Sequence, residues 1–158
     1  MEDRAFTVLA FVAALGCGIV GGIFYAFSSF VMRALGRLPP DQGAAAMKSI
    51  NVAVINPVFM AAFMGTALVC LVLAGLALPR MVGREGALAL AGALFYLLGC
   101  FGVTMVFNVP LNNALARAAP DEEPAVWSRY LRVWTLWNTV RTAAGALASA
   151  LLVAALMS

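Results

Sequence analysis

Four long stretches of almost uninterrupted apolar residues dominate the chain, and shorter polar segments separate them. They cover residues 6–32, 57–78, 87–109 and 136–157. About 20 helical residues cross the hydrocarbon core of a bilayer, so each stretch is long enough to span a membrane. The pattern therefore predicts an all-α fold, an integral membrane four-helix bundle, in which residues 1–158 form one membrane domain.

The segment between the first two spans has a different pattern. Its apolar residues recur at helical spacing, at Met47, Ile50 and Val54. This spacing predicts a short amphipathic helix. Asn56-Pro57 follows, and asparagine before proline is typical of a helix cap and first turn. We therefore expect Asn56 to cap the second span, a structural role that competes with a role in any site.

The fourth helix is predicted to extend beyond the bilayer. It has no proline after Pro124, and Gly145 is its single glycine. A helix from Pro124 to residue 157 is about 50 Å long, against about 30 Å of hydrocarbon. In the first span, Gly18 and Gly22 have the spacing of a close contact with another helix.

Composition agrees with a lipid environment and limits the partners. The chain is 64% hydrophobic and 11% charged, whereas soluble domains are about 45–50% apolar and about 25% charged. The lipid bilayer is therefore a predicted partner. The net charge is +3, and the arginines form no tract with interleaved aromatic residues. No nucleic-acid partner is expected.

The chain contains no histidine, and its seven carboxylates lie outside the apolar stretches. The usual ligand of haem, copper and non-haem iron is therefore missing, and so is the usual proton shuttle near neutral pH. We predict no metal site and no cofactor. Cys17, Cys70 and Cys100 are isolated, without a C-x-x-C pair. They are expected to be small apolar packing residues.

One end of the predicted bundle differs from the other. Because successive spans alternate in direction, the unusual polar residues share one membrane side: Tyr25, Ser28, Ser29, Arg33, Asn51, Asn56, Asn108, Asn112, Asn113, Asn138 and Arg141. Polar residues in apolar helices usually face the bundle interior. Convergence of these groups would make a small cavity of amide, hydroxyl and guanidinium groups between walls of tryptophan and phenylalanine.

The fourth helix contributes a stripe to this end. Tyr130, Trp134, Asn138 and Arg141 share one helical face, and Asn108 and Asn112 share another if the third helix continues through Pro110. Interface anchoring, snorkelling and packing between helices are the alternative explanations for such residues. Arg141 favours a site, because an unpaired guanidinium inside the apolar boundary costs about 1–3 kcal/mol. No carboxylate occurs at that depth, so an anionic ligand is expected.

Charge also predicts an orientation. The side with the first and third loops has seven basic residues, at positions 33, 37, 48, 117, 129, 132 and 141, against three, at positions 4, 80 and 84. The positive-inside rule then places loops one and three in the cytoplasm. The prediction is a multi-pass protein of the cell (inner) membrane.

The same residues resemble the anthrone oxygenase-like family of small four-span membrane proteins. The similar segments are Gly22-Ile-Phe-Tyr-Ala-Phe-Ser28, Asn56-Pro57, Phe107-Asn-Val-Pro-Leu-Asn-Asn113 and Trp134-Thr-Leu-Trp-Asn-Thr-Val-Arg141. The resemblance covers essentially the whole chain. It implies oxidation of an anthrone by dioxygen to an anthraquinone and water, in aromatic polyketide pathways and without a redox cofactor. A small aromatic substrate and dioxygen are then the expected partners.

The residues are compatible with this chemistry. Arg141, with Asn138, Asn108 or Asn112, is expected to bind the enolate oxygen, as preorganised donors do in oxyanion sites. Trp134 and Trp137 are expected to stack on the substrate rings. The candidate substrate contacts also include Ser29, Asn56 and Asn113. No histidine or buried carboxylate offers a base, so Tyr25, water or the solution has to accept the proton.

Two other functions remain open. The chain is either an oxygenase or a non-enzymatic subunit or assembly factor whose polar end binds a partner or a small aromatic anion. An exporter ranks third, because proton-coupled carriers normally hold an acidic residue within the membrane. A concave pocket between spans favours the enzyme, and polar residues spread over an outer face favour the partner. A homo-oligomer also remains open.

Overall fold

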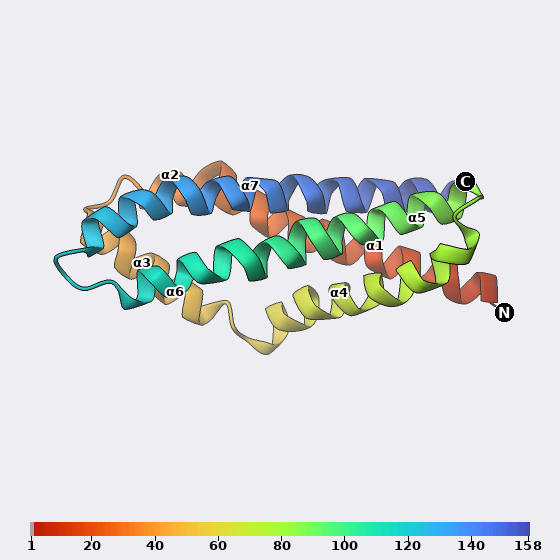
Figure 1. The fold of residues 1–158 in the computed structure, drawn as a ribbon, viewed down its shortest axis with the longest axis horizontal. Coiled ribbons are helices and arrows are strands. Elements are labelled where there is room, and N and C mark those ends of the chain that lie inside the picture. The colour runs from red at the N-terminus through yellow and green to blue at the C-terminus, as the bar shows by residue number, and fades with distance from the viewer. Residues whose placement is uncertain (1) are drawn as a thin grey trace.

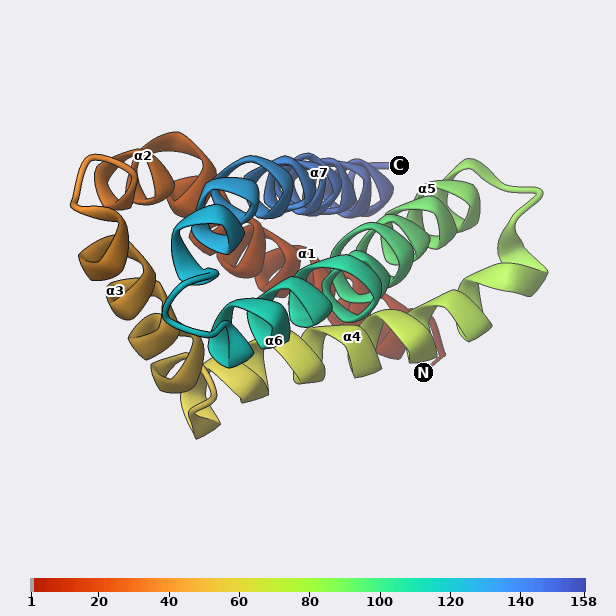
Figure 2. The same ribbon diagram turned by 60° about the vertical axis from the view of Figure 1, so that its left-hand side comes forward.

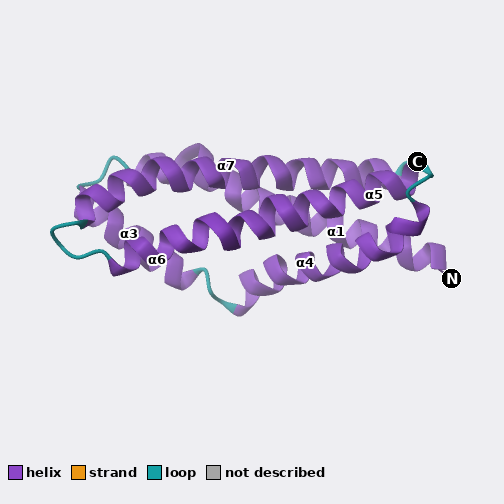
Figure 3. Ribbon diagram, viewed as in Figure 1, coloured by secondary structure: helices purple, strands orange, loops and turns teal. Residues whose placement is uncertain are grey.

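Long helices make up almost the whole protein. The computed structural model describes residues 2–158, and every regular element in that range is a helix (Figure 3). In chain order the elements are α1 (Glu2–Ala26), η1 (Phe27–Val31), α2 (Met32–Leu35), α3 (Pro40–Ala53), α4 (Pro57–Ala77), η2 (Leu78–Arg80), α5 (Arg84–Leu94), η3 (Phe95–Gly102), η4 (Thr104–Asn108), α6 (Val109–Arg117) and α7 (Glu123–Leu156). The elements η1, η3 and η4 are π-helical, and η2 is a 3₁₀ turn.

Several of these elements join end to end. Four helices are long and apolar enough to cross a membrane: Arg4–Leu35, Pro57–Arg80, Arg84–Arg117 and Glu123–Leu156. They pack side by side along the length of the molecule (Figure 1). The predicted all-α, four-helix membrane bundle is confirmed, as are the short amphipathic helix, which is α3, and the extended fourth helix, which is α7.

The two ends of the bundle are built differently. One end carries α2, α3, α6 and the start of α7, and the other carries both chain termini and the turn between α4 and α5 (Figures 1 and 2). The sequence prediction that the first and third loops lie at the same end is therefore confirmed. We refer to these parts as the cavity half and the terminal half.

The core of the terminal half contains a few large side chains, such as Phe6, Leu73 and Leu152, and many small ones: Ala10, Ala13, Ala14, Cys17, Ala77, Ala89, Ala93, Ala148 and Ala155. They allow α1 and α7 to approach closely, and a Cβ atom on Gly145 would lie 2.9 Å from the Cα atom of Gly21. The prediction that Gly18 and Gly22 make the close contact is therefore wrong in part. Gly22 is exposed, and a Cβ atom there would meet nothing within 4 Å. Gly22 does not make the contact because the face of α1 that packs against α7 passes through Gly21.

Large side chains form the second core, in the cavity half. It contains Met32, Ala44, Met47, Leu115, Trp127, Tyr130 and Trp134. The amphipathic helix α3 covers this core, and its buried residues are Gly43, Ala44 and Met47. Gly43 permits the contact, because a Cβ atom there would lie 2.9 Å from a ring carbon of Trp127. An ion pair between Lys48 and Glu123 also joins α3 to α7.

The boundaries of the second and third helices have local causes. The side chain of Asn56 accepts hydrogen bonds from the backbone N–H groups of Val58 and Phe59, at 3.1 and 3.0 Å, so the predicted cap is confirmed. The third helix continues past Pro110, because the π-helical turn η4 leads directly into α6. As a result Asn108 and Asn112 both reach α7, the shared face that the sequence predicts if the helix continues.

Candidate functional site

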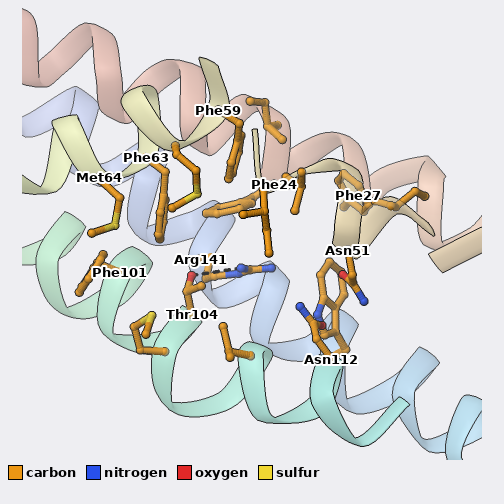
Figure 4. A pocket seen from close by; sticks show the side chains of 18 of the residues that line it. Phe24, Phe27, Asn51, Phe59, Phe63, Met64, Phe101, Thr104, Asn112 and Arg141 are labelled. Atoms are coloured by element: carbon orange, nitrogen blue, oxygen red, sulfur yellow. Dashed lines mark hydrogen bonds between the residues drawn. The ribbon is translucent and has the colours of Figure 1, made fainter. Parts of the chain in front are cut away.

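A cavity of about 390 Å³ lies between the four long helices in the cavity half (Figure 4). Aromatic side chains form much of its wall: Phe24, Phe27, Phe59, Phe63, Phe101 and Trp134. Its polar lining consists of Asn51, Thr104, Asn112 and Arg141. Among the described residues that line the cavity, Arg141 alone carries a charge, and none is acidic.

The guanidinium group of Arg141 is the dominant polar feature. Arg141 is only 4% exposed, and its side chain points from α7 toward the middle of the cavity (Figure 4). Its Nη1 donates to Thr104 Oγ1 at 3.1 Å, and its Nη2 donates to Asn138 Oδ1 at 2.7 Å. The carbon at the centre of the guanidinium lies 4.0 Å from the Phe24 ring centroid and 5.1 Å from that of Trp134. Two aromatic rings therefore stabilise the cation.

This guanidinium still has donors to spare. An arginine offers five N–H donors, and the two hydrogen bonds above use two of them. Within the described part of the chain, Arg141 Nε and the buried Trp134 Nε1 have no hydrogen-bond partner. Leaving buried donors unsatisfied costs about 1–3 kcal/mol each. Both residues line the cavity, but these two nitrogen atoms are themselves fully buried.

Asn138 fixes the position of the guanidinium from behind. Its Oδ1 accepts from Arg141, while its Nδ2 donates to the backbone carbonyl of Phe24 and to Ser28 Oγ, both at 2.7 Å. Asn138 is fully buried. One amide therefore ties α7 to α1 and orients the arginine at the same time. Because Phe24 contacts the guanidinium through its ring, the same bond also holds part of the cation site together.

A second polar group lies toward α3. Tyr130 donates its hydroxyl hydrogen to Asn112 Oδ1 at 2.7 Å, and Asn51 Nδ2 lies 3.5 Å from the same hydroxyl oxygen. The ring of Tyr130 is stacked between Trp127 and Trp134, with centroids 5.7 and 5.6 Å away. This aromatic stack within α7 holds Trp134 at the cavity wall, and the Tyr130 hydroxyl links α7 to α3 and α6.

Thr104 owes its position to the unusual third helix. It begins the π-helical turn η4, and a single residue, Val103, separates this turn from the π-helical segment η3. Its hydroxyl donates to the Cys100 carbonyl at 2.7 Å and accepts from Arg141. π-Helical turns are rare and are often found at functional sites. Here the turns place Phe101 and Thr104 on the cavity wall.

Comparison with known proteins adds a family to this geometry. A family model described as anthrone oxygenase matches residues 58–151. The chain belongs to the anthrone oxygenase family. No curated protein and no solved structure matches it. The resemblance seen in the sequence is confirmed, and the segment that matches this oxygenase family includes Thr104, Asn112, Trp134 and Arg141.

The structure brings five of the ten predicted site residues to the cavity or directly behind its wall. Arg141, Trp134 and Asn112 line it. Asn138 and Asn108 lie behind the wall, where Asn108 Nδ2 donates to the carbonyl of Trp134 at 3.2 Å. These two buried amides position cavity residues of the oxygenase-family segment, and they do not line the cavity themselves.

The other five predicted residues lie elsewhere. Tyr25 is 61% exposed, Asn113 is exposed, and Asn56 is occupied as a helix cap. The hydroxyl of Ser29 donates to the Tyr25 carbonyl of its own helix at 2.7 Å. Trp137 stacks on Phe107 with a centroid distance of 3.7 Å. None of these side chains lines the cavity.

Sequence reasoning missed most of the aromatic wall and Thr104. Phe24, Phe59, Phe63 and Phe101 belong to helices that are apolar on every side, so periodicity does not mark them. Thr104 did carry a signal, because it lies four residues before Asn108 and therefore on the same helical face. The described residues hold no cluster of three or more His, Cys, Asp or Glu side chains that could bind a metal ion.

Proposed function

We propose that the protein is a membrane-embedded oxygenase that oxidises an anthrone-like or phenolic aromatic substrate with dioxygen to a quinone, without a redox cofactor. The observation that carries this proposal is the buried guanidinium of Arg141 in an aromatic cavity without any carboxylate. An anion with a flat apolar body satisfies both features at once. Family membership supports the same assignment.

The cavity suits such a ligand. Its volume of about 390 Å³ lies within the usual range of about 300–1,000 Å³ for small-molecule sites. The rings of Phe24, Phe63 and Trp134 offer faces and edges for a planar substrate. The guanidinium of Arg141, held in place by Thr104 and Asn138, is then the group to which an enolate oxygen would bind. Donors that are already in place stabilise charge as it develops.

The reaction balances without an external electron donor. Loss of a proton from the methylene carbon of an anthrone gives an electron-rich enolate. This enolate transfers electrons to dioxygen, a carbon–oxygen bond forms, and the returned proton gives a hydroperoxide at that carbon. Cleavage of the oxygen–oxygen bond with loss of the second C–H proton releases water and leaves the new carbonyl. One anthrone and one dioxygen thus yield one anthraquinone and one water.

The protein's part is to make the enolate accessible. Among the described residues lining the cavity, no side chain is a base at neutral pH, so we assign the proton acceptor to water. The guanidinium favours proton loss because it stabilises the anion and not the neutral substrate. Asn138 and Thr104 are positioning residues, since they act through Arg141.

The orientation proposal follows from charge. Arg141 is buried in the cavity, so it is left out of the count, and the cavity half still has the larger number of basic residues: Arg33, Arg37, Lys48, Arg117, Arg129 and Arg132. The terminal half has Arg4, Arg80 and Arg84. We infer that the cavity half faces the cytoplasm from the cell membrane.

Oxygen uptake tests the proposal. Metal-free protein purified in detergent is given an anthrone, and its rate is compared with the spontaneous rate and with the variants Arg141→Met and Arg37→Met. Arg37 is an exposed arginine at the same end and is the matched control. We expect catalysed uptake in the wild type and in Arg37→Met, and loss of about 100-fold or more in Arg141→Met. Binding without uptake by well-folded wild type would instead favour a non-enzymatic binder of aromatic anions.

A further inference from the structure

The lining of the cavity is not equally buried around its circumference. Most lining residues are buried or half-buried, but three are exposed: Ile55 at 72%, Met64 at 45% and Met105 at 51%. Met64 belongs to α4, Met105 belongs to η4, and Ile55 lies in the link that leads into α4. A residue that lines a cavity and is also exposed marks its opening. All three residues at this opening are uncharged and apolar.

The helix packing explains why the opening is at this place. The helix α4 packs against α1, α5 and η3, and its contacts with η4 and α6 are at most sparse. The second and third membrane-spanning helices therefore separate along the cavity. Met64 lies on one side of the gap, and Phe101 and Thr104 lie on the other (Figure 4). Leu68 and Val106, close to the opening on the same helices, are exposed apolar residues. Such a surface on membrane-spanning helices faces lipid.

The side of the cavity toward water is covered. There α3 packs on α6 and α7, and the buried core beneath it contains Met47, Trp127, Tyr130 and Trp134. Gly43 lies directly against the Trp127 ring, and Lys48 pairs with Glu123. A solute from water would have to displace this packed helix, whereas a solute in the bilayer meets only the side chains of two methionines and an isoleucine.

We propose that the gap between α4 and η4 is a lateral portal, gated by Met64 and Met105, through which the substrate enters the cavity from the bilayer. The inference rests on the proposed function and narrows its substrate class to aromatic compounds that dissolve in lipid in their neutral form. Methionine suits such a gate because its side chain is flexible and apolar. The substrate passes the apolar rim uncharged and becomes an anion only beside Arg141.

The test measures the rate at which a planar aromatic probe reaches the cavity. The probe is 1,8-dihydroxyanthraquinone, delivered in phospholipid vesicles that contain the protein, and quenching of tryptophan fluorescence is followed by stopped flow. The double variant Met64→Phe/Met105→Phe narrows the portal. Leu68→Phe/Val106→Phe is the matched control, because it adds at least as much bulk to the same helices at residues that are exposed and do not line the cavity.

We expect the gate variant to slow association and dissociation together by about tenfold each, because a barrier on the path alters both rates. The control variant should behave as the wild type. Unchanged rates in the gate variant, with native helix content, would overturn the portal. The portal would also be overturned if the wild type bound the water-soluble anthraquinone-2-sulfonate as fast as the neutral probe at equal aqueous concentration.

These outcomes separate the two proposals. If the portal is wrong and the oxygenase assignment is right, the anthrone is still oxidised in an Arg141-dependent manner while the gate variant shows unslowed probe association. If the oxygenase assignment is wrong and the portal is right, oxygen uptake stays at the spontaneous rate while probe association is still slowed by the gate variant. An absence of saturable quenching in the wild type would overturn the portal for this class of compound.

Discussion

The terminal half and the cavity half use the same four helices but pack them with different side chains. In the terminal half, alanine, glycine and cysteine allow close contact between helices, as at Gly21 and Gly145. In the cavity half, phenylalanine, tryptophan and tyrosine hold the helices apart, and α3 covers the widened end. Small residues drive helix association in lipid because they allow dense packing. The terminal half thus holds the bundle together while the cavity half leaves room for a ligand.

The same contrast applies to polar groups. The polar side chains of the terminal half satisfy backbone groups of neighbouring helices, as Ser149 does by donating to the Ala14 carbonyl at 2.9 Å. Those of the cavity half form a network that ends at Arg141 and leaves donors unused. A polar group in lipid is expensive unless it is satisfied. Among the described residues, the buried side-chain atoms without a partner belong to Asn108, Trp134, Thr135 and Arg141, all in the cavity half, and this favours a ligand there.

The largest expected effect comes from replacing Arg141 by lysine. Arg141→Lys keeps a positive charge but loses the planar group that bonds Thr104 and Asn138 and stacks near Phe24. We expect kcat/KM for oxygen uptake to fall about 100-fold, which corresponds to about 2.7 kcal/mol of transition-state stabilisation. Wild-type kcat/KM in this variant would show that only charge matters and that the geometry of the guanidinium does not.

The next effect is expected at Asn138. Asn138→Leu removes three hydrogen bonds and leaves the Phe24 carbonyl and the guanidinium without their shared partner. We expect a loss of about 2–3 kcal/mol in the free energy of unfolding, measured in mixed detergent micelles. As a positioning residue, Asn138 should affect kcat more than the binding of the neutral probe. Weakened probe binding with normal kcat would contradict that role.

A substitution in the terminal half should change stability without changing the chemistry. In Gly145→Val the new side chain meets the backbone of Gly21, so we expect a loss of about 1–3 kcal/mol in the free energy of unfolding. Gly22→Val is the matched control, because a Cβ atom there meets nothing within 4 Å. Equal losses in the two variants would contradict the observed helix contact. Folded Gly145→Val protein should keep the wild-type kcat.

The smallest expected effects are at two predicted residues that the structure places outside the cavity. Tyr25→Phe and Trp137→Leu should each change kcat/KM by less than about twofold, since surface substitutions away from a site are usually nearly neutral. Oxygen-uptake kinetics of the two variants check this. A large loss of kcat in Tyr25→Phe would support the predicted role of Tyr25 as proton acceptor and contradict its assignment to the outer surface.

Sequence reasoning succeeded where polar residues interrupt an apolar pattern. The stripe of Tyr130, Trp134, Asn138 and Arg141 is buried as predicted. Four polar or aromatic residues on one face of an apolar helix indicate which face turns toward the bundle interior. Asn56 was predicted as a cap for a similar reason, since its local hydrogen bonds depend only on its neighbours. Both predictions rest on short-range geometry.

The parts that sequence reasoning could not provide depend on helix rotation. Residues 57–77 are apolar all round, so no periodicity shows that Phe59, Phe63 and Met64 face the cavity. Trp137 looks like Trp134 in the sequence, yet its ring stacks on Phe107 and does not line the cavity. The π-helical turns also rotate the third helix by an amount that no residue pattern reveals. Packing between helices decides these positions.

The absorbance spectrum of a bound probe would show whether Arg141 holds an aromatic anion in the cavity. The probe 1,8-dihydroxyanthraquinone changes colour when it ionises, so its spectrum reports its charge. The measurement is made about one pH unit below the pKa of the free probe. With wild-type protein we expect the spectrum of the anion, and with Arg141→Met we expect the spectrum of the neutral form. A neutral spectrum with saturated wild type, or the same anion spectrum with the variant, would contradict the account.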